Sequence, residues 1–406
     1  MILRNRSLLA LLVAEVVSGI GSRMTALALP WFVLVTTHSP AKMGLVLAAE
    51  LLPMGLLGIP SGTVVLRLGA RTTMLASDLV RVPLMALLPL LHAAGVLSFP
   101  LLLLLVAAFG VFWSPYFSAQ RVILPELLGD DEQVIAQANS VFEGSTSTAG
   151  LLGPPLAGLL IAWLGAANVI YVDAASFLVS FVLVLLFVPR RAHVAVTEEG
   201  GGVLAGIRFV FRDALMGPLV GVIVLMNALG QMFAGALPVL AFERYQDPKV
   251  GGWLFAAFGI GGLLGTVLAF RLIARVQPLP LASVAMVGIA LPLWVLPFHV
   301  PLALILAAIV LSALCNPSVN GPMIGAITAR TPKPLLPKVM TAVLTVATIA
   351  GPLGLLTGGW LLQHEGLATT FAVIAGGETA VSVVFVALIA RYRRSQTGEL
   401  ATVGSP

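Results

Sequence analysis

Long apolar runs alternate with short polar breaks along almost the whole of this 406-residue chain. A bilayer core about 30 Å thick needs roughly 20 apolar residues to be crossed by a helix. Backbone groups in lipid must be bonded within their own segment, and the runs are too long and continuous for barrel strands. The pattern predicts twelve spanning helices, over 7–36, 42–66, 73–93, 98–120, 138–163, 167–189, 215–240, 250–274, 278–298, 300–327, 339–363 and 367–391.

The composition agrees with an all-α polytopic membrane protein. Hydrophobic residues are 59% of the chain and charged residues 10%, against roughly 25% charged in soluble domains. The first apolar run is too long for a cleavable signal and no small-residue cleavage site ends it, so we expect a retained first span. The single cysteine, Cys315, excludes a disulfide within the chain.

The basic residues predict the orientation. If the N-terminus is cytoplasmic, nearly all loop arginines and lysines lie on that side, and only Lys42, Arg244 and Lys249 lie outside. The positive-inside rule then puts both termini in the cytoplasm, as an even number of spans requires. The net charge of +5 is therefore an orientation signal and does not indicate nucleic-acid binding.

The longest break between spans divides the chain in the middle. It covers 190–214 and contains a Gly-Gly-Gly run at 200–202. We expect a six-helix bundle on each side of it. The predicted organisation is an N-terminal bundle over 1–190, a cytoplasmic linker over 191–214, a C-terminal bundle over 215–395 and a cytoplasmic tail over 396–406.

Three sequence matches, in register and in the same order, indicate that the two bundles arose by duplication. Gly62 to Arg71 after span 2 matches Gly265 to Arg275 after span 8. Trp113-Ser-Pro115 matches Cys315-Asn-Pro317, and Gly153-Pro154 matches Gly351-Pro352. Two pseudo-symmetric six-helix halves with a shared site at mid-membrane are a plan typical of transporters.

With these motifs the chain resembles the major facilitator superfamily, in particular its bacterial twelve-span drug, macrolide and siderophore exporters. The likeness covers the whole chain in span count, loop lengths and midpoint linker. The stretches 22–30 and 138–140 are also similar to this group. The resemblance implies the major facilitator fold, a multi-pass protein of the bacterial cytoplasmic (inner) membrane, a small-molecule substrate, contact with membrane lipid and a monomeric state.

The family's Gly-x-x-x-Asp-Arg-x-Gly-Arg loop and Gly-Pro-x-x-Gly-Gly motif suggest gating residues. Leu66 stands where the family usually has aspartate, Ala157 replaces one glycine, and span 4 lacks an early arginine. The loop arginines can bond helix carbonyls, and the proline bends span 5. Orientation alone and a simple kink are the alternatives. The gating candidates, with an ion pair expected near the cytoplasmic end of span 3, are Gly62, Arg67, Gly69, Arg71, Asp78, Arg81, Gly153, Pro154 and Gly158.

Polar and aromatic side chains recur on spans 1, 4, 7 and 10, which line the cavity in the resembled family. Such groups belong against protein or a wet cavity; the alternative is ordinary bonding between helices. The predicted cavity residues are Ser18, Ser22, Arg23, Phe112, Trp113, Tyr116, Asn227, Gln231, Asn316 and Asn320. Trp31 and Phe233 lie on the same spans, although Trp31 also fits an interfacial anchor.

Charges inside spans cost about 2.5–3.5 kcal/mol each on insertion scales, so they mark function. Glu15 shares the polar stripe of span 1, and Glu50 and Glu378 also lie deep. These three carboxyls are the proton-coupling candidates, with a packing role as the alternative for Glu378. Arg23 could hold a carboxylate or attract an anionic group. Glu143 and Asp173 are expected to be wet, near helix ends.

Several classes of protein lack their motifs here. The chain has no phosphate loop, no metal-ligand spacing and no paired nucleophile and base, so we expect no cofactor, no metal and no enzymatic activity. The sequence therefore predicts a secondary active exporter of lipophilic small molecules, working by alternating access with proton antiport. An importer or a lipid or lysophospholipid flippase of the same fold is the alternative, and a channel is less well supported.

Overall fold

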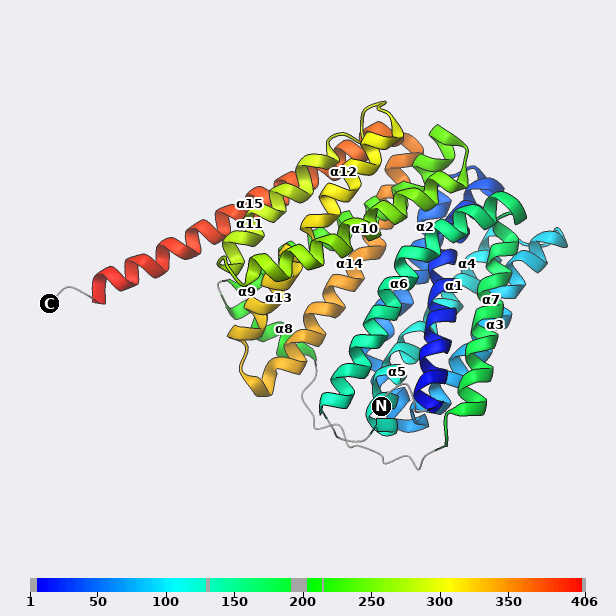
Figure 1. The fold of residues 1–406 in the computed structure, drawn as a ribbon. Coiled ribbons are helices and arrows are strands. Elements are labelled where there is room, and N and C mark those ends of the chain that lie inside the picture. The colour runs from blue at the N-terminus through cyan, green and yellow to red at the C-terminus, as the bar shows by residue number, and fades with distance from the viewer. Residues whose placement is uncertain (1–5, 129–131, 191–202, 214, 404–406) are drawn as a thin grey trace. The chain divides into compact units, whose positions relative to one another are not determined.

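The computed structural model describes residues 6–128, 132–190, 203–213 and 215–403, and these residues form helices and no strand. The helices are α1 (Arg6–Thr37), α2 (Pro40–Leu68), α3 (Ala70–Ala93), α4 (Phe99–Val111), α5 (Trp113–Leu128), α6 (Glu132–Leu164), α7 (Ala166–Phe187), α8 (Val203–Arg212), α9 (Met216–Leu240), η2 (Ala241–Tyr245), α10 (Pro248–Ile273), α11 (Pro278–Leu293), α12 (Leu302–Cys315), α13 (Pro317–Arg330), η3 (Lys333–Leu335), α14 (Leu336–His364) and α15 (Gly366–Val403) (Figure 1).

The predicted spans are confirmed as helices. Eleven helical stretches of the described chain are long and apolar enough to cross a membrane, and a shorter apolar helix, Pro278–Leu293, stands at the ninth span. We call the membrane face at which α1 begins the terminal face and the other the opposite face. Counting the spans, α3 begins at the terminal face, and α2 and α7 begin at the opposite face.

Spans 4 and 10 each break into two helices at matching places. α4 ends at Val111 and α5 begins at Trp113, while α12 ends at Cys315 and α13 begins at Pro317. Proline has no N–H for the preceding turn and is best accommodated in the first turn of a new helix. The matched sequences Trp113-Ser-Pro115 and Cys315-Asn-Pro317 thus coincide with matched breaks, as a duplicated chain would produce.

The chain folds into two compact units. The first comprises Met1–Glu199, Ala234–Ala256 and Leu355–Gln363, and the second comprises Gly200–Phe233, Ala257–Gly354 and His364–Pro406. The first unit therefore contains all six N-terminal spans together with the parts of α9, α10 and α14 next to the opposite face. The predicted linker falls largely on 191–202, which lies outside the described residues, and its end forms α8.

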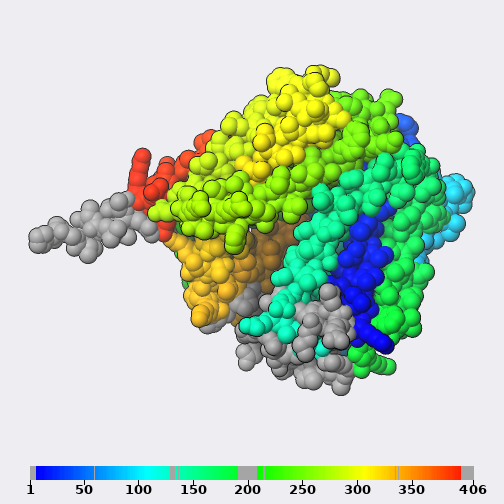
Figure 2. Space-filling model, viewed as in Figure 1, coloured from blue at the N-terminus to red at the C-terminus, as the bar shows by residue number. Residues whose placement is uncertain are grey.

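In the first unit, α1 packs along both α6 and α7. Figures 1 and 2 show this helix lying between them, and the two pairings are among the most extensive in the chain. The apolar core near the terminal face joins α1, α3, α5 and α7, with Leu8, Met74, Ile123 and Val184 at 2% exposure or less. This core fixes the helices that carry the polar side chains described below.

The second unit has two apolar cores. One joins α9, α11, α13 and α15 and includes Met286, Met323 and Phe385, all fully buried. The other seats α8 against the starts of α9 and α14 and the end of α13, with Val210 buried in it. Phe211, the next residue of α8, is 67% exposed.

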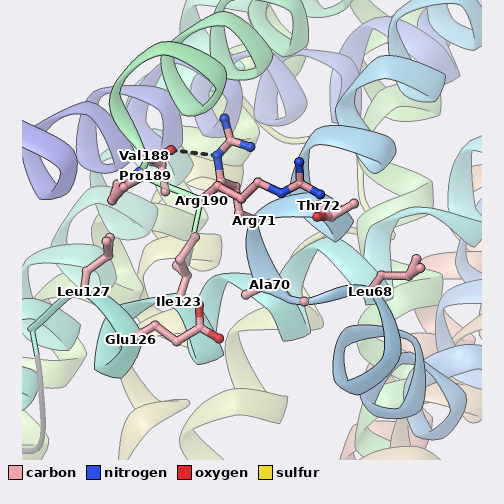
Figure 3. A pocket seen from close by; sticks show the side chains of 11 residues that line it. Leu68, Ala70, Arg71, Thr72, Ile123, Glu126, Leu127, Val188, Pro189 and Arg190 are labelled. Atoms are coloured by element: carbon pink, nitrogen blue, oxygen red, sulfur yellow. Dashed lines mark hydrogen bonds between the residues drawn. The ribbon is translucent and has the colours of Figure 1, made fainter. Parts of the chain in front are cut away.

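Arg71 holds the end of α7 inside the first unit. Its Nε donates to the carbonyl of Val188 at 2.6 Å (Figure 3). One of its terminal nitrogens donates to the carbonyl of Leu185 at 2.8 Å. The last carbonyls of a helix lack partners within the helix and carry its negative dipole end, so a guanidinium there stabilises it. Arg67, four residues earlier, is exposed on α2.

Arg71→Ala is expected to lower the free energy of unfolding by about 1–2 kcal/mol, because two charge-assisted bonds to helix-terminal carbonyls are lost. Thermal unfolding of the purified protein in detergent measures this. Arg67→Ala is the matched control from the same loop and should change stability by less than about 0.5 kcal/mol. Equal effects of the two variants would contradict the capping role.

Asp213 precedes α9 in the second unit and caps its first turn. Its Oδ1 accepts the N–H groups of Leu215 at 2.8 Å and Met216 at 2.9 Å, and its Oδ2 lies 3.4 Å from Arg330. Partial desolvation opposes ionisation of Asp213, but the two N–H donors and the Arg330 charge outweigh it, and the net effect lowers the pKa of this carboxyl. Arg330 also donates to the Tyr392 hydroxyl.

Because the folded-state pKa of Asp213 is lowered, its contribution to stability is present above the unfolded value of about 3.9 and is lost as pH falls through the folded value. Asp213→Asn keeps an acceptor for the cap and removes the charge, so its unfolding temperature should fall less between pH 5 and pH 3, roughly, than that of the wild type. Asp213→Ala should cost about 1 kcal/mol at neutral pH. Wild-type acid sensitivity in Asp213→Asn would contradict this assignment.

Candidate functional site

A buried ion pair lies at the centre of the first unit. Arg81 and Asp78 on α3 are 3.5 Å apart, with side chains 4% and 0% exposed. Ser180 on α7 donates to Asp78 Oδ2 at 2.7 Å. The pair was expected near the end of span 3, beside Arg71, but Asp78 lies about 12 Å along the axis from the first residue of α3. The pair lies between α3 and its two neighbours in the same unit, α5 and α7.

Three aromatic rings enclose the Arg81 guanidinium. Its central carbon lies 4.4 Å from the centre of the Tyr116 ring, 4.9 Å from Phe177 and 6.0 Å from Phe109. The electron-rich faces of aromatic rings attract a cation, most strongly where water is excluded. Arg81 Nε and Asp78 Oδ1 are nevertheless buried without a hydrogen-bond partner among the described residues. The pair is therefore stabilised by charge and rings, with its hydrogen bonding incomplete.

Glu15, about 14 Å from the start of α1, lies at about the same depth as this pair. Its carboxylate accepts a hydrogen bond from Gln120 on α5, which is 8% exposed. The charges of Arg81, Arg23 and Glu143 all reach Glu15. Gln120 was missing from the predicted site, although a glutamine four residues after Tyr116 in a span was a usable signal.

Asp173 is fully buried, which corrects the prediction of a wet position near a helix end. Thr25 on α1 donates to its Oδ2 at 2.5 Å, and Ser176 on α7 donates to its Oδ1 at 3.2 Å. Gly21, one turn before Thr25, makes room: a Cβ at Gly21 would lie 2.6 Å from Asp173 Oδ1 and 2.4 Å from Ser176 Oγ. The position of Asp173 near the start of its span suggested contact with water, but the close packing of α1 on α7 excludes water there.

The predicted cavity residues of the first unit separate into interior and accessible groups. Tyr116 was expected at the cavity; instead its ring is 6% exposed and its hydroxyl lies 3.3 Å from Ser180 Oγ, inside the bundle. Ser18 is also buried, Ser22 and Phe112 are half-buried, and Arg23 is exposed.

A ladder of accessible side chains runs along α5. Trp113 is 37% exposed and stacks on Phe117, with ring centres 5.1 Å apart. Arg121, one further turn along, holds its guanidinium 4.6 Å from the Phe117 ring centre. Of these three residues, Trp113 was predicted to line the cavity.

The polar residues predicted on spans 7 and 10 lie in the second unit. Asn227 and Gln231 on α9 and Asn316 before α13 are half-buried, and Asn320 on α13 is exposed. Trp31, considered as an anchor or a stacking surface, is buried in the first unit against Phe242 with the rings edge to face.

Two further carboxyls were proposed for coupling. Glu50 on α2 is half-buried, and its charge and that of Asp173 repel each other. Glu378 on α15, in the second unit, is 5% exposed, and its Oε2 has no hydrogen-bond partner in the described chain. The next turn of α15 is tied to α11, because Ser382 donates to the Met286 carbonyl at 2.9 Å.

The glycine-proline motif of span 5 contacts two helices within the first unit. A Cβ at Gly153 would lie 2.4 Å from Arg23 Cβ on α1, and one at Gly158 would lie 2.7 Å from the Pro248 carbonyl at the start of α10. In return, a Cβ at Gly252 would lie 2.7 Å from the Pro154 carbonyl. The α6–α10 contact is thus backbone against backbone.

The remaining gating candidates differ in their surroundings. Gly69 joins α2 and α3 and lines the same pocket as Arg71. A Cβ at Gly62 would meet open space, so no close helix contact there requires this glycine. Among the described residues, no group of three histidine, cysteine, aspartate or glutamate side chains could hold a metal ion.

The chain was compared with known families, proteins and structures. The sequence model of the Major Facilitator Superfamily matches residues 11–246 and 219–404. The multidrug efflux pump Tap of Mycolicibacterium fortuitum is 30% identical over 399 residues, covering 94% of this chain and 95% of that protein. The multidrug efflux pump Tap of Mycobacterium tuberculosis (strain ATCC 25618 / H37Rv) is 27% identical over 380 residues, covering 90% and 89%.

Solved structures agree on the fold. The nucleoside transporter NupG superposes with a TM-score of 0.77 at 13% identity, covering 94% of this chain and 99% of that one. A bacterial homolog of the human lysosomal transporter Spinster, in an inward-facing and unoccupied conformation, gives a TM-score of 0.69 at 17% identity, covering 95% of each chain. Taken with the family match, these likenesses show that the chain is a membrane transporter of the major facilitator superfamily.

Proposed function

We propose that this transporter is a secondary active exporter of lipophilic small molecules that works by alternating access and proton antiport. The observation that carries the proposal is the group of hydrogen-bonded carboxyls inside the first unit, Glu15, Asp78 and Asp173, that lie within reach of one guanidinium, that of Arg81. The relatives named multidrug efflux pumps support the direction of transport. We further propose a monomer in the cytoplasmic membrane of a bacterium, with the terminal face and both chain ends inside.

The proposed substrates are drugs, macrolide-like natural products or siderophores. Trp113 and Phe117 offer an accessible aromatic surface, and flat aromatic faces stack on apolar and aromatic molecules. Asn227, Gln231, Asn316 and Asn320 supply neutral hydrogen-bonding groups on α9 and before and within α13. Such a mixture, with few fixed charges, favours lipophilic molecules over highly charged ones.

Glu15 is the leading coupling residue in this proposal. A carboxyl half-buried between the Gln120 amide and two arginines can be either ionised or neutral. Taking up a proton there removes a charge from a low-dielectric site, which changes how strongly α1 and α5 attract each other. Glu50 and Glu378 are the further coupling candidates, the latter with packing against α11 as its alternative.

Closure near the opposite face is the proposed gating event. The Gly158–Pro248 and Gly252–Pro154 contacts, the Trp31–Phe242 rings and the Ser39–Gln363 hydrogen bond at 2.7 Å all lie within the first unit near that face. Export by alternating access requires these contacts to part and re-form in each cycle. Gly153, Pro154 and Gly158 act in this gate, while Arg71 supports it indirectly by holding α7.

The second candidate is an importer or a lipid or lysophospholipid flippase of the same fold. The many exposed apolar side chains of the helices, such as Trp163 and Phe270, fit a protein surrounded by lipid and do not exclude lipid as cargo. Deletion of the gene separates the cases: loss of an exporter raises the intracellular drug level, and loss of an importer lowers nutrient entry.

Glu15→Gln is expected to reduce export of ethidium driven by an imposed pH gradient in liposomes by about tenfold or more, because the variant cannot carry a proton. Exchange of labelled for unlabelled ethidium, which needs no net proton movement, should remain. Glu365→Gln, in the loop between α14 and α15, is the control and should behave as the wild type. Full gradient-driven export by Glu15→Gln would remove Glu15 from the coupling mechanism.

Gly158→Ala is expected to weaken closure near the opposite face, because its Cβ would press on the Pro248 carbonyl at 2.7 Å. The readout is maleimide labelling of Val250→Cys, a position 5% exposed in the first unit, in a Cys315→Ser background. Labelling should rise about threefold or more over the same protein with Gly158, while Gly150→Ala, whose Cβ meets open space, should leave it unchanged. Equal labelling in all three would contradict the gate.

A further inference from the structure

The strongest unassigned feature of the molecule is the buried surrounding of Asp173. Its carboxylate occupies a notch on α1 opened by Gly21, accepts hydrogen bonds from Thr25 and Ser176, and is 0% exposed. A buried ionisable group in a membrane span is costly and needs a partner or a purpose. Two hydroxyl donors favour the ionised carboxylate, and the same hydroxyl oxygens can accept a hydrogen bond from the carboxylic acid, so the surroundings also accommodate a proton.

The charges around Asp173 do not balance. Asp78, Arg81 and Asp173 are the charged side chains of the described first unit that are more than nine-tenths buried. Arg81 is engaged at 3.5 Å by Asp78 and attracts Asp173 only at longer range. A low-dielectric interior disfavours an uncompensated charge by several kcal/mol or more. One guanidinium can compensate one carboxylate, so one of the two aspartates is expected to carry a proton.

We propose that Asp173 is a reversible proton-binding site of this transporter, with Arg81 as the counter-ion that it shares with Asp78. This inference rests on the proposed antiport and goes beyond it by naming a residue on α7. Proton binding forms one O–H bond on the Asp173 carboxylate, and release breaks that bond and returns the proton to water. No other bond changes and no electron is transferred.

The neighbouring carboxyls differ in depth. Asp173 lies about 10 Å from the start of α7 and Glu50 about 15 Å from the start of α2, so Asp173 is the nearer of the two to the opposite face and Glu50 lies close to the membrane centre. Glu50 is half-buried, and its charge and that of Asp173 repel each other, so protonation of one carboxyl favours ionisation of the other. Glu15, about 14 Å from the start of α1, also lies close to the membrane centre and is within reach of the Arg81 charge.

Asp173 and Glu15 thus both act on the Arg81 charge, Asp173 from the opposite-face side of the Asp78–Arg81 pair and Glu15 from about the same depth as the pair. When Asp173 is protonated, Arg81 is compensated by Asp78 alone. When Asp173 is ionised, it competes for the same guanidinium, and the incomplete hydrogen bonding of Arg81 Nε and Asp78 Oδ1 leaves this pair able to adjust. Proton binding at the α1–α7 contact is thereby linked to the Asp78–Arg81 ion pair of α3, which lies against α5 and α7.

The test is infrared difference spectroscopy of the purified full-length protein between acidic and alkaline pH, without any substrate. Wild type should show the carbonyl band of a protonated carboxylic acid, and Asp173→Asn should lack that component. Thr25→Val removes a donor that favours the ionised form, so the transition should move to higher pH by about one unit. Thr36→Val, whose hydroxyl bonds only within α1, is the matched control and should not shift it.

Gradient-driven ethidium transport in liposomes gives the second readout. Asp173→Asn should lose about tenfold or more of the gradient-driven rate while keeping ethidium exchange. Asp247→Asn, an aspartate that caps α10 outside the spans, is the control and should match the wild type. An unchanged infrared band, or an undiminished gradient-driven rate, in Asp173→Asn would overturn the assignment. Absence of proton movement in the wild type would instead contradict the antiport itself, whatever the band does.

Discussion

The interior of the first unit is governed by one constraint: Arg81, a permanently charged guanidinium, is buried among the helices of the unit and must be compensated. Asp78 supplies the direct ion pair, and the rings of Phe109, Tyr116 and Phe177 surround the cation. Breaking such a pair by removing one partner typically costs about 3–5 kcal/mol. The carboxyls that reach the same guanidinium therefore cannot titrate independently of it, and this linkage is the physical basis of the proton coupling that we propose.

Close packing keeps this charged interior dry. Gly21 lets α1 approach α7 at Asp173, and Gly153 lets α6 approach α1 at Arg23. Because neither position carries a side chain, α1 packs closely on both α6 and α7, and Thr25 of α1 reaches Asp173 of α7. The same kind of contact, backbone against a glycine, joins Gly158 on α6 to the start of α10, where we propose the gate.

The spans were predictable from sequence because a long apolar run in lipid must satisfy its own backbone hydrogen bonds, and a helix does so. The broken spans were predictable in part: Trp113-Ser-Pro115 and Cys315-Asn-Pro317 matched in sequence, and both mark the junctions of two helices. The partners of the charges were not. Asp173 looked wet because it is close to the start of α7, and Tyr116 looked accessible because it shares a helix with Trp113. Both depend on which face of a helix meets its neighbour, which hydrophobic spans with little amphipathicity do not encode.

Proton release on substrate binding is the most direct measure of the central claim. Purified transporter in weakly buffered detergent, with a pH indicator dye, is mixed with ethidium at saturating concentration. If substrate and proton compete through the buried carboxyls around Arg81, binding should release a substantial fraction of one proton per protein near neutral pH, and release should vanish at a pH where those carboxyls are fully ionised. Saturable binding with no proton release across the whole pH range would contradict the account.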